Sequence, residues 1–183
     1  MKFKNHEEIA KKYEMGGGWM SLEEGDNQIR LVSEFEDYGT HFDQIKKRSV
    51  ICIGKEHCEY CIKGDKPKVQ FIGWVIDRKD QQIKLLRIGY KIFTQIGELS
   101  KSKEYAFEIL PSYDITIRRK GQKLDTTYTV IPARQDIELT EDEKNRILEE
   151  IKQPKEIIDQ MKAKIAITPE DTEEFGPENE EEL

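Results

Sequence analysis

Alternating apolar and polar residues run through the middle of the chain and predict a succession of β-strands. The strands are expected over residues 28–33, 48–53, 69–77, 82–90, 112–121 and 126–132. The turn-forming sequence RKDQ separates the third strand from the fourth and predicts a hairpin. Ile92, Ile96 and Leu99 then recur at helical spacing, which predicts a short helix over 91–99. Five or six short strands with one interposed helix predict a mainly β fold with peripheral helices, an OB-type Greek-key barrel.

The N-terminal segment has a different pattern from the strands that follow it. Residues 5–14 are expected to form a short helix, which the three glycines at 16–18 break. Residues 1–18 are therefore expected to form an N-terminal arm, followed by the barrel core over 19–135.

Helical signals return at the C-terminal end. The sequence TEDE, beginning at Thr140, has the capping-box pattern that starts a helix. Pro154 ends that helix and can start another. Residues 136–167 are therefore expected to form C-terminal helices, and the acidic, proline-punctuated residues 168–183 a disordered tail.

Charge is segregated along the chain, which has 183 residues and a net charge of −7. Residues 168–183 hold eight acids and no base, and residues 136–167 hold nine acids and six bases. Residues 41–135 instead hold 19 bases and 11 acids, a net charge of +8. A basic body with an acidic tail suggests a polyanionic partner.

Several classes of protein do not fit the sequence. No apolar run approaches the roughly 18 residues of a membrane span, and the first residues, MKFKNHEEIAKKYE, are too polar for a signal peptide. We therefore expect a cytoplasmic protein with no membrane partner. An enzyme is not expected, because the chain lacks a glycine-rich phosphate loop, a His-Glu zinc-protease helix and a nucleophile elbow.

The three cysteines fall close together, at Cys52, Cys58 and Cys61. Three cysteines in so short a segment indicate metal binding rather than a disulfide framework, and free buried cysteines are the alternative. A Cys-x2-Cys pair can bring two thiolates to one ion, and zinc takes four ligands in a tetrahedron. His41 is the preferred fourth ligand, and His57 is the alternative, disfavoured because it directly precedes Cys58. The sequence predicts one structural Zn²⁺ in a loop over 41–64.

Basic and aromatic residues are interleaved on the predicted strands. Single-stranded nucleic acid is held by aromatic side chains that stack on bases and by cations that contact phosphates. Each tyrosine, and Trp74 as well, suits a core position as well as a stacking position, and each cation suits ordinary solvent exposure. The predicted nucleic-acid contacts are Trp74, Arg87, Tyr90, Lys91, Tyr113, Arg118, Arg119, Lys120, Tyr128, Lys46, Lys47 and Arg48.

These features together resemble the zinc-containing single-stranded-DNA-binding proteins of tailed phages. The resemblance rests on the order His41, Cys52, Cys58, Cys61, on the segment LLRIGYKIFTQI (85–96), and on the acidic C-terminus ending in leucine. It covers about residues 26–135 and the tail. It implies an OB fold with an inserted zinc subdomain, and a sequence-tolerant protein that coats and protects single-stranded DNA in replication, recombination and repair. A phage-encoded protein of this kind would act in the host-cell cytoplasm.

The same resemblance gives the tail a role. In this family an acidic tail recruits replication and recombination proteins and competes with DNA for the basic groove. The corresponding residues here are Glu180, Glu181, Glu182 and Leu183, and a tail that only aids solubility is the alternative. The alternative function for the whole chain is a zinc-stabilised regulatory module that binds protein or duplex DNA, which would show no preference for single strands.

Overall fold

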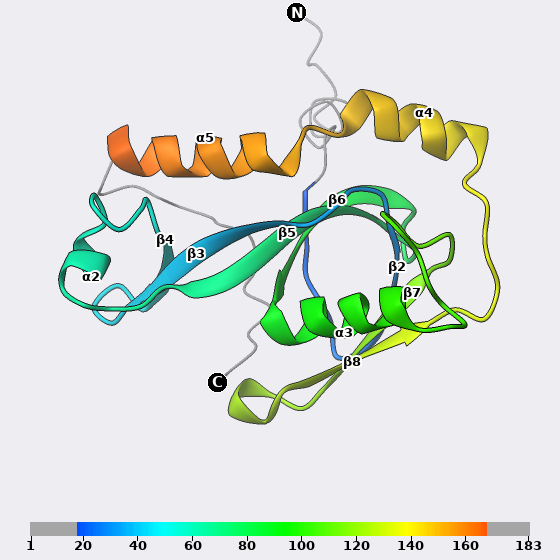
Figure 1. Ribbon diagram of the computed structural model, residues 1–183, viewed down its shortest axis with the longest axis horizontal. Coiled ribbons are helices and arrows are strands. Elements are labelled where there is room, and N and C mark those ends of the chain that lie inside the picture. The colour runs from blue at the N-terminus through cyan, green and yellow to red at the C-terminus, as the bar shows by residue number, and fades with distance from the viewer. Residues whose placement is uncertain (1–17, 168–183) are drawn as a thin grey trace, which may run out of the picture.

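The computed structural model describes residues 18–167, so the expected N-terminal helix and the acidic tail with Glu180–Leu183 lie outside the described residues. Figure 1 shows a β-sheet with helices on both sides of it. The strands are β1 (Trp19–Met20), β2 (Gly25–Leu31), β3 (Glu36–Asp43), β4 (Arg48–Ile51), β5 (Lys68–Asp77), β6 (Gln82–Gly89), β7 (Ile115–Lys120) and β8 (Thr127–Pro132). The helices are α2 (Glu59–Ile62), α3 (Tyr90–Lys101), the short 3-10 helix η1 (Lys123–Asp125), α4 (Glu141–Glu150) and α5 (Pro154–Ile167).

All eight strands belong to one sheet. Its strand order is β1-β6-β5-β2-β7-β8, and β3 pairs with both β4 and β5. The hairpin expected from RKDQ is present, with β5 and β6 in register from Gln70–Gly89 to Asp77–Gln82. Only the short β1 runs parallel to its neighbour, β6, among the described strands.

Helix α3 fills the space between β6 and β8, which do not pair with each other within residues 18–167. Its apolar side buries Ile92 and Ile96 in the core. Its Gln95 side chain bonds to the open edge of β8, where Nε2 donates to the Tyr128 carbonyl oxygen at 3.1 Å and Oε1 accepts from the Val130 N–H at 2.9 Å. Gln95 therefore satisfies two backbone groups that a neighbouring strand would otherwise satisfy.

The sheet has an apolar core on each face, because successive residues of a strand point to opposite sides. On β5, Phe71 and Val75 join the core beside α3, whereas Ile72, Trp74 and Ile76 join a second core. Ile158 and Met161 of α5 close the second core. In consequence β5 is buried on both faces, without interruption from Phe71 to Asp77.

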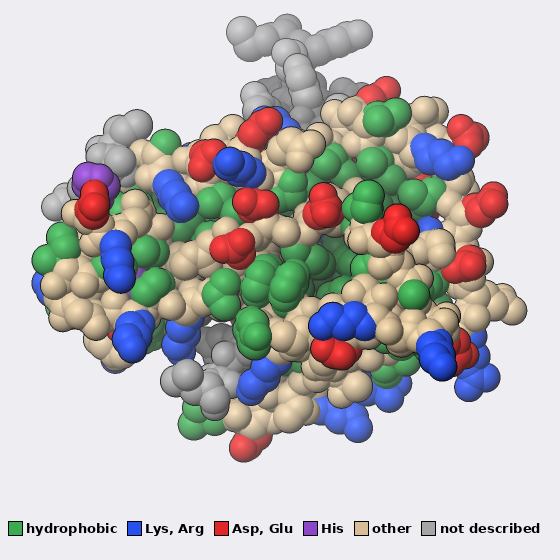
Figure 2. All heavy atoms as spheres, in the orientation of Figure 1, with side chains coloured by type: hydrophobic (Ala, Val, Ile, Leu, Met, Phe, Trp, Pro, Cys, Tyr) green, Lys and Arg blue, Asp and Glu red, His purple; other side chains and the backbone are tan. Residues whose placement is uncertain are grey.

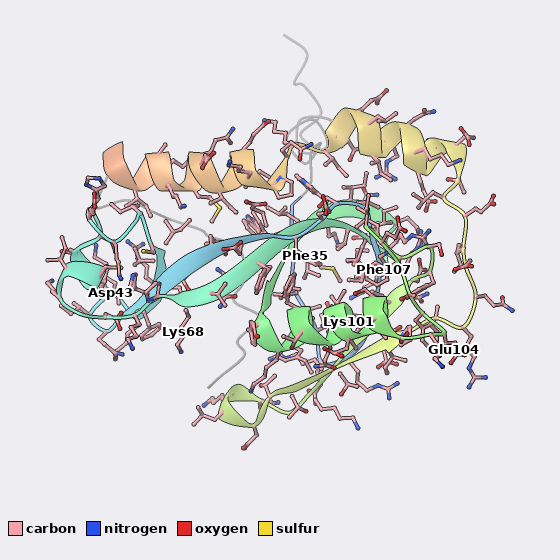
Figure 3. The ribbon with its side chains drawn as sticks, viewed as in Figure 1. Phe35, Asp43, Lys68, Lys101, Glu104 and Phe107 are labelled. Atoms are coloured by element: carbon pink, nitrogen blue, oxygen red, sulfur yellow. The ribbon has the colours of Figure 1, made fainter. Side chains whose placement is uncertain are left out.

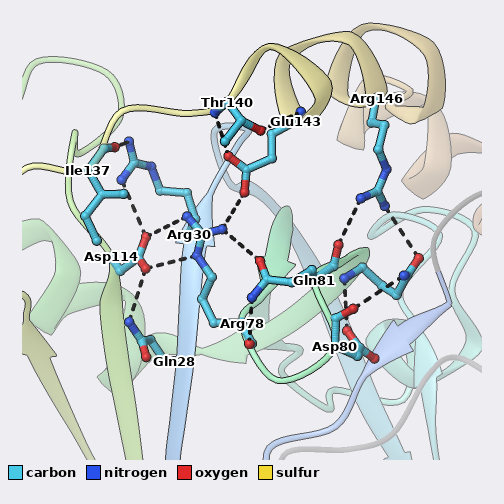
Figure 4. Close-up of polar contacts among 11 residues, drawn as sticks. Gln28, Arg30, Arg78, Asp80, Gln81, Asp114, Ile137, Thr140, Glu143 and Arg146 are labelled. Atoms are coloured by element: carbon cyan, nitrogen blue, oxygen red, sulfur yellow. Dashed lines mark hydrogen bonds and ion pairs between the residues drawn. The ribbon is translucent and has the colours of Figure 1, made fainter.

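Buried charged side chains attach α4 to the sheet (Figure 4). Arg78 donates from Nε and Nη2 to the Asp114 carboxylate at 3.0 and 3.1 Å, and from Nη1 to Glu143 at 2.6 Å. Arg30 lies 3.5 Å from the same aspartate and also donates to the Ile137 carbonyl oxygen at 2.6 Å. We call these four charged residues, Arg30, Arg78, Asp114 and Glu143, the Arg78 network.

The structure confirms a mainly β class with peripheral helices and corrects several details. Strand β3 was not expected from the sequence, and neither were the short elements β1, α2 and η1. The first predicted strand starts and ends earlier than expected, at Gly25 and Leu31, and β7 starts only at Ile115. The capping box of α4 is present as predicted, with Thr140 and Glu143 bonded reciprocally.

Candidate metal centre and nucleic-acid surface

A projection from the sheet, which we call the Cys/His arm, comprises residues 36–67 (Figure 1). Strands β3 and β4 pair from Thr40–Ile51 to Asp43–Arg48, and the Cys52 N–H extends this pairing by bonding to the Gly39 carbonyl oxygen at 2.8 Å. This register places Cys52 opposite Gly39 and His41 opposite Val50, so His41 and Cys52 are diagonal neighbours on one face of the hairpin.

The remaining two ligands come from the knuckle around α2. Cys58 stands directly before α2 and Cys61 lies within it, and residues three apart in a helical turn lie on one face. The chain enters this turn through Gly54, which has the positive φ of 110° that favours glycine, and the Gly54 carbonyl oxygen accepts from the Cys58 N–H at 2.8 Å.

The structure brings together the four predicted ligands His41, Cys52, Cys58 and Cys61. Their ligand atoms all lie within 4.8 Å of one another. The Cys61 sulfur is 3.5 Å from the Cys52 sulfur and 3.3 Å from the His41 Nε2 atom. Three thiols and one imidazole are a donor set suited to zinc, and the four of them would complete a tetrahedron with no position left for a catalytic water.

His41 is oriented toward the thiols by two further contacts. Its Nδ1 atom lies 2.8 Å from a carboxylate oxygen of Asp65, and its ring stacks on Tyr60 with centroids 5.2 Å apart. A carboxylate on the second ring nitrogen is the usual partner of a metal-bound histidine, because it fixes the ring and its tautomer. His57 is exposed and lies outside the cluster. The fourth member of the cluster is therefore His41.

The thiols are too close together to ionise independently. Burial, followed by the neighbouring Cys52 and Cys58, raises the pKa of the Cys61 thiol to about 12. Burial also acts to raise the pKa of Cys58, but hydrogen bonds from the backbone N–H groups of Cys61 and Tyr60 outweigh it and hold that pKa below its usual value. A metal cation bound among the sulfurs would favour the thiolate forms of Cys58 and Cys61.

The residues predicted to contact nucleic acid differ in how far their side chains are exposed to solvent. Trp74, Arg87 and Tyr113 are each only 4% exposed, so they cannot stack on a base or reach a phosphate in this conformation. The Trp74 indole N–H donates to the Lys152 carbonyl oxygen at 2.8 Å, and the Tyr113 hydroxyl donates to the Tyr105 carbonyl oxygen at 2.6 Å. Their contact with DNA therefore stays a prediction, and in this structure helices and loops cover all three side chains.

Two arginines of the predicted basic run already have structural partners. Arg118 forms a two-point ion pair with Asp26, at 2.6 and 2.9 Å, and its guanidinium lowers the pKa of that carboxylate. Arg119 donates from Nη1 to the Leu22 carbonyl oxygen at 2.9 Å. Both arginines are partly exposed, so their charge still contributes to the surface potential.

The other predicted contacts lie on the surface. Lys46, Lys47, Tyr90, Lys91 and Lys120 are exposed, and Arg48 and Tyr128 are partly exposed. Lys46 and Lys47 occupy the turn between β3 and β4, and Lys120 ends β7. In Figure 2, basic side chains predominate along the lower edge of the face shown, whereas acidic side chains gather over its upper part.

Partly exposed aromatic residues that the sequence did not single out lie on the α3 side of the sheet. Phe35 and Phe107 lie between the strands and α3 in Figure 3, and Phe93 belongs to α3 itself. The Phe35 ring meets Phe93 edge-on at 6.2 Å and lies over Gly73, where a Cβ atom would be only 2.8 Å from the ring. The only sequence signal was Gly73, a glycine within an otherwise apolar strand, which often marks a close approach.

Comparison with known proteins gives one partial similarity. No family model matches the chain, and no solved structure matches it. A protein of Escherichia phage T5, named a probable ssDNA-binding protein, is 37% identical over 67 residues, which are 36% of this chain and 24% of the T5 protein. The chain thus matches about a quarter of the length of that relative. Within the described residues, no helix is both long and apolar enough to cross a membrane.

Proposed function

We propose that this protein binds single-stranded DNA without strong sequence preference, and that it coats and protects the strand passively. The observation that carries the proposal is the partial similarity to the T5 protein. The exposed cations add support, since a polyanion partner needs accessible positive charge. Roles in replication, recombination and repair belong to the same proposal.

We infer that the sheet is an OB-type barrel. The order β6-β5-β2-β7-β8, with α3 between β6 and β7, matches five Greek-key strands with one interposed helix. OB folds bind oligonucleotides over their second and third strands and with the loops after the first and fourth strands. The Cys/His arm occupies the first of these loops, and the β7–β8 connection occupies the second. Lys46, Lys47 and Lys120 lie in or beside these two loops.

We propose that the Cys/His cluster holds one structural zinc ion. Two of its members, His41 and Cys58, are only 2% and 3% exposed, and its four donors leave no open position for chemistry. Metal analysis of the protein should find one zinc per chain, and zinc should be absent from a Cys58→Ser/Cys61→Ser variant. A wild-type protein that folds and melts identically with and without zinc would contradict the assignment.

The DNA-binding proposal is tested by titrating labelled single-stranded and duplex oligonucleotides at two salt concentrations. Single strands should bind more tightly, and affinity should fall steeply with salt because counterions are released. A Lys46→Gln/Lys47→Gln variant should lower the salt slope by about 1.4, since each lost phosphate contact on a single strand reduces it by about 0.7. The matched control is Lys152→Gln/Lys155→Gln, at exposed positions in the α4–α5 connection and the first turn of α5. It makes the same change in charge and should leave the slope unchanged.

Equal affinity for single strands and duplex would instead favour the alternative, a zinc-stabilised module that binds duplex DNA or protein.

The tail residues Glu180, Glu181, Glu182 and Leu183 are proposed to recruit partner proteins and to compete with DNA for the basic surface. Deleting residues 168–183 should tighten single-strand binding at low salt. Unchanged affinity there would contradict the competition.

A further inference from the structure

The basic turn between β3 and β4 has a fixed shape. Its residues are Gln44–Lys47, and Lys47 has a positive φ of 53°, which is uncommon for a residue with a side chain. One carboxylate oxygen of Asp43 accepts hydrogen bonds from the Ile45 and Lys46 N–H groups at 2.8 and 2.9 Å. Asp43 therefore closes the turn, and it decides how Lys46 and Lys47 are presented to solvent.

The second carboxylate oxygen of Asp43 points to the metal-binding knuckle. It accepts a hydrogen bond from the Tyr60 hydroxyl at 2.7 Å. Tyr60 lies between Cys58 and Cys61 in the sequence, and its ring stacks on the His41 imidazole. The Tyr60 side chain thus contacts one proposed ligand, His41, and bonds to Asp43, which shapes the basic turn. Tyr60 also lies between two further proposed ligands, Cys58 and Cys61, in the sequence.

We propose that Tyr60 and Asp43 are positioning residues that couple the metal cluster to the basic turn, so that an ordered cluster holds Lys46 and Lys47 ready to meet phosphates. This inference rests on the proposed binding of single-stranded DNA. A turn that is ordered before binding loses less conformational entropy when it engages a strand, so it contributes more affinity per contact. The role of the cluster in binding is then indirect, since none of its ligands needs to touch DNA.

The test is a Tyr60→Phe variant, which keeps the ring on His41 and removes only the hydroxyl. The number of zinc ions bound per chain, measured after loading with Zn²⁺ and without DNA, should equal that of the wild-type protein. The amide protons of Ile45 and Lys46 should exchange faster with solvent, because Asp43 is released to move. Affinity for a labelled single strand at low salt should fall by about threefold to tenfold.

The effect should depend on the two lysines. Adding Tyr60→Phe to the Lys46→Gln/Lys47→Gln variant should cause no further loss of affinity, because the turn then carries no charge to position. Tyr105→Phe, which removes a hydroxyl outside the Cys/His arm, is the matched control and should bind like wild type. Asp43→Asn weakens the same link from the other side and should reproduce the faster exchange of the Ile45 and Lys46 amide protons. Exchange is the readout for this variant because it also removes a negative charge beside the two lysines.

Each outcome separates the two proposals. If Tyr60→Phe binds and exchanges like wild type while Lys46→Gln/Lys47→Gln weakens binding, the coupling is wrong and the DNA-binding function stands. If Tyr60→Phe loses zinc, Tyr60 acts through ligand binding and the coupling is also wrong. If wild-type protein shows no preference for single strands, both proposals fail together.

Discussion

Two clusters of buried polar groups hold peripheral parts of this molecule in place, and they do so by different means. The Arg78 network joins α4 to the sheet with its own opposite charges, and Asp114 is matched by two guanidinium groups. The Cys/His cluster groups three thiols with one imidazole and contains no cation of its own. The first cluster is complete within the chain, whereas the second, as we propose, is completed by a zinc ion from solution.

The surroundings of the two clusters sharpen this contrast. The Arg78 network lies against the sheet, next to the second apolar core and the C-terminal helices. In the Cys/His arm only Tyr38 and Ile51 are buried large apolar residues, and Ile45 and Ile62 are 93% and 69% exposed. The arm therefore has little hydrophobic stabilisation, and we expect the metal to supply most of what orders it.

Removing the metal is expected to have the largest effect, because a structural zinc site contributes on the order of 10 kcal/mol of binding free energy. In the presence of a chelator, amide protons of residues 36–67 should lose protection from exchange, while those of β6 and β7 keep theirs. Hydrogen exchange read by mass spectrometry makes the comparison directly. Equal loss across the whole sheet would show that the arm and the body are not independent.

Breaking the Arg78 network is expected to have the next largest effect, and it should act on the body. Arg78→Met removes the two-point partner of Asp114, whose side chain is only 3% exposed, and leaves that carboxylate with the longer Arg30 contact at 3.5 Å. Removing one partner of a buried ion pair costs about 3 kcal/mol. Urea denaturation of the zinc-loaded protein measures this loss. The neighbouring Lys79→Met is the control, since Lys79 and its partner Glu23 are both well exposed and their ion pair should contribute little to stability.

Lowering the pH should weaken the Arg78 network through protonation of Glu143. Burial acts to raise its pKa, but the Thr140 N–H and the Arg78 guanidinium outweigh burial and hold the pKa below the usual 4.5. A depressed carboxylate pKa contributes stability that is complete above about pH 4.5 and is lost as the pH falls through the folded value. Glu143→Gln should remove this part of the acid sensitivity, as measured by denaturation between pH 3 and pH 6. Glu141→Gln, on the exposed side of the same helix, should leave the profile unchanged.

The smallest effect is expected at Trp74. Its indole is 4% exposed and bonded to the Lys152 carbonyl oxygen, so bound DNA should not reach it. Trp74→Phe should change single-strand affinity by less than about twofold, since no contact with the strand is lost. Quenching of fluorescence on binding, if observed, should persist in Trp74→Phe and disappear in Trp19→Phe, because Trp19 is partly exposed. The reverse pattern would mean that the C-terminal helices move aside when DNA binds.

The grouping of His41, Cys52, Cys58 and Cys61 could be predicted because metal coordination imposes spacing rules that a sequence displays directly, and their binding of zinc stays a prediction. The β5–β6 hairpin, α3 and the capping box at Thr140 were predictable for a similar reason, since each depends on neighbouring residues. Strand β3 was missed because EDYGTHFD has no clear alternation, and its position depends on pairing with β4 and β5.

The buried aromatic residues show the limit of pattern analysis. Alternation along β5 identifies two faces, but it does not say that α5 covers the face of Trp74. The burial of Arg87 and Tyr113 was unforeseen in the same way, because partners distant in sequence decide burial. The Tyr60–Asp43 hydrogen bond joins residues 17 positions apart and had no signature in the sequence.

The side chain of Gln95 affects whether another molecule can add a strand to the β8 edge of this sheet. An unpaired strand edge is a template onto which another molecule can add a strand, and crowding makes such additions more frequent. Proteins that line up on one nucleic-acid strand meet at very high local concentration. By bonding to Tyr128 and Val130, Gln95 blocks part of the β8 edge with a side chain that cannot propagate a sheet. That part of the β8 edge is therefore not available as a template for a strand of another molecule.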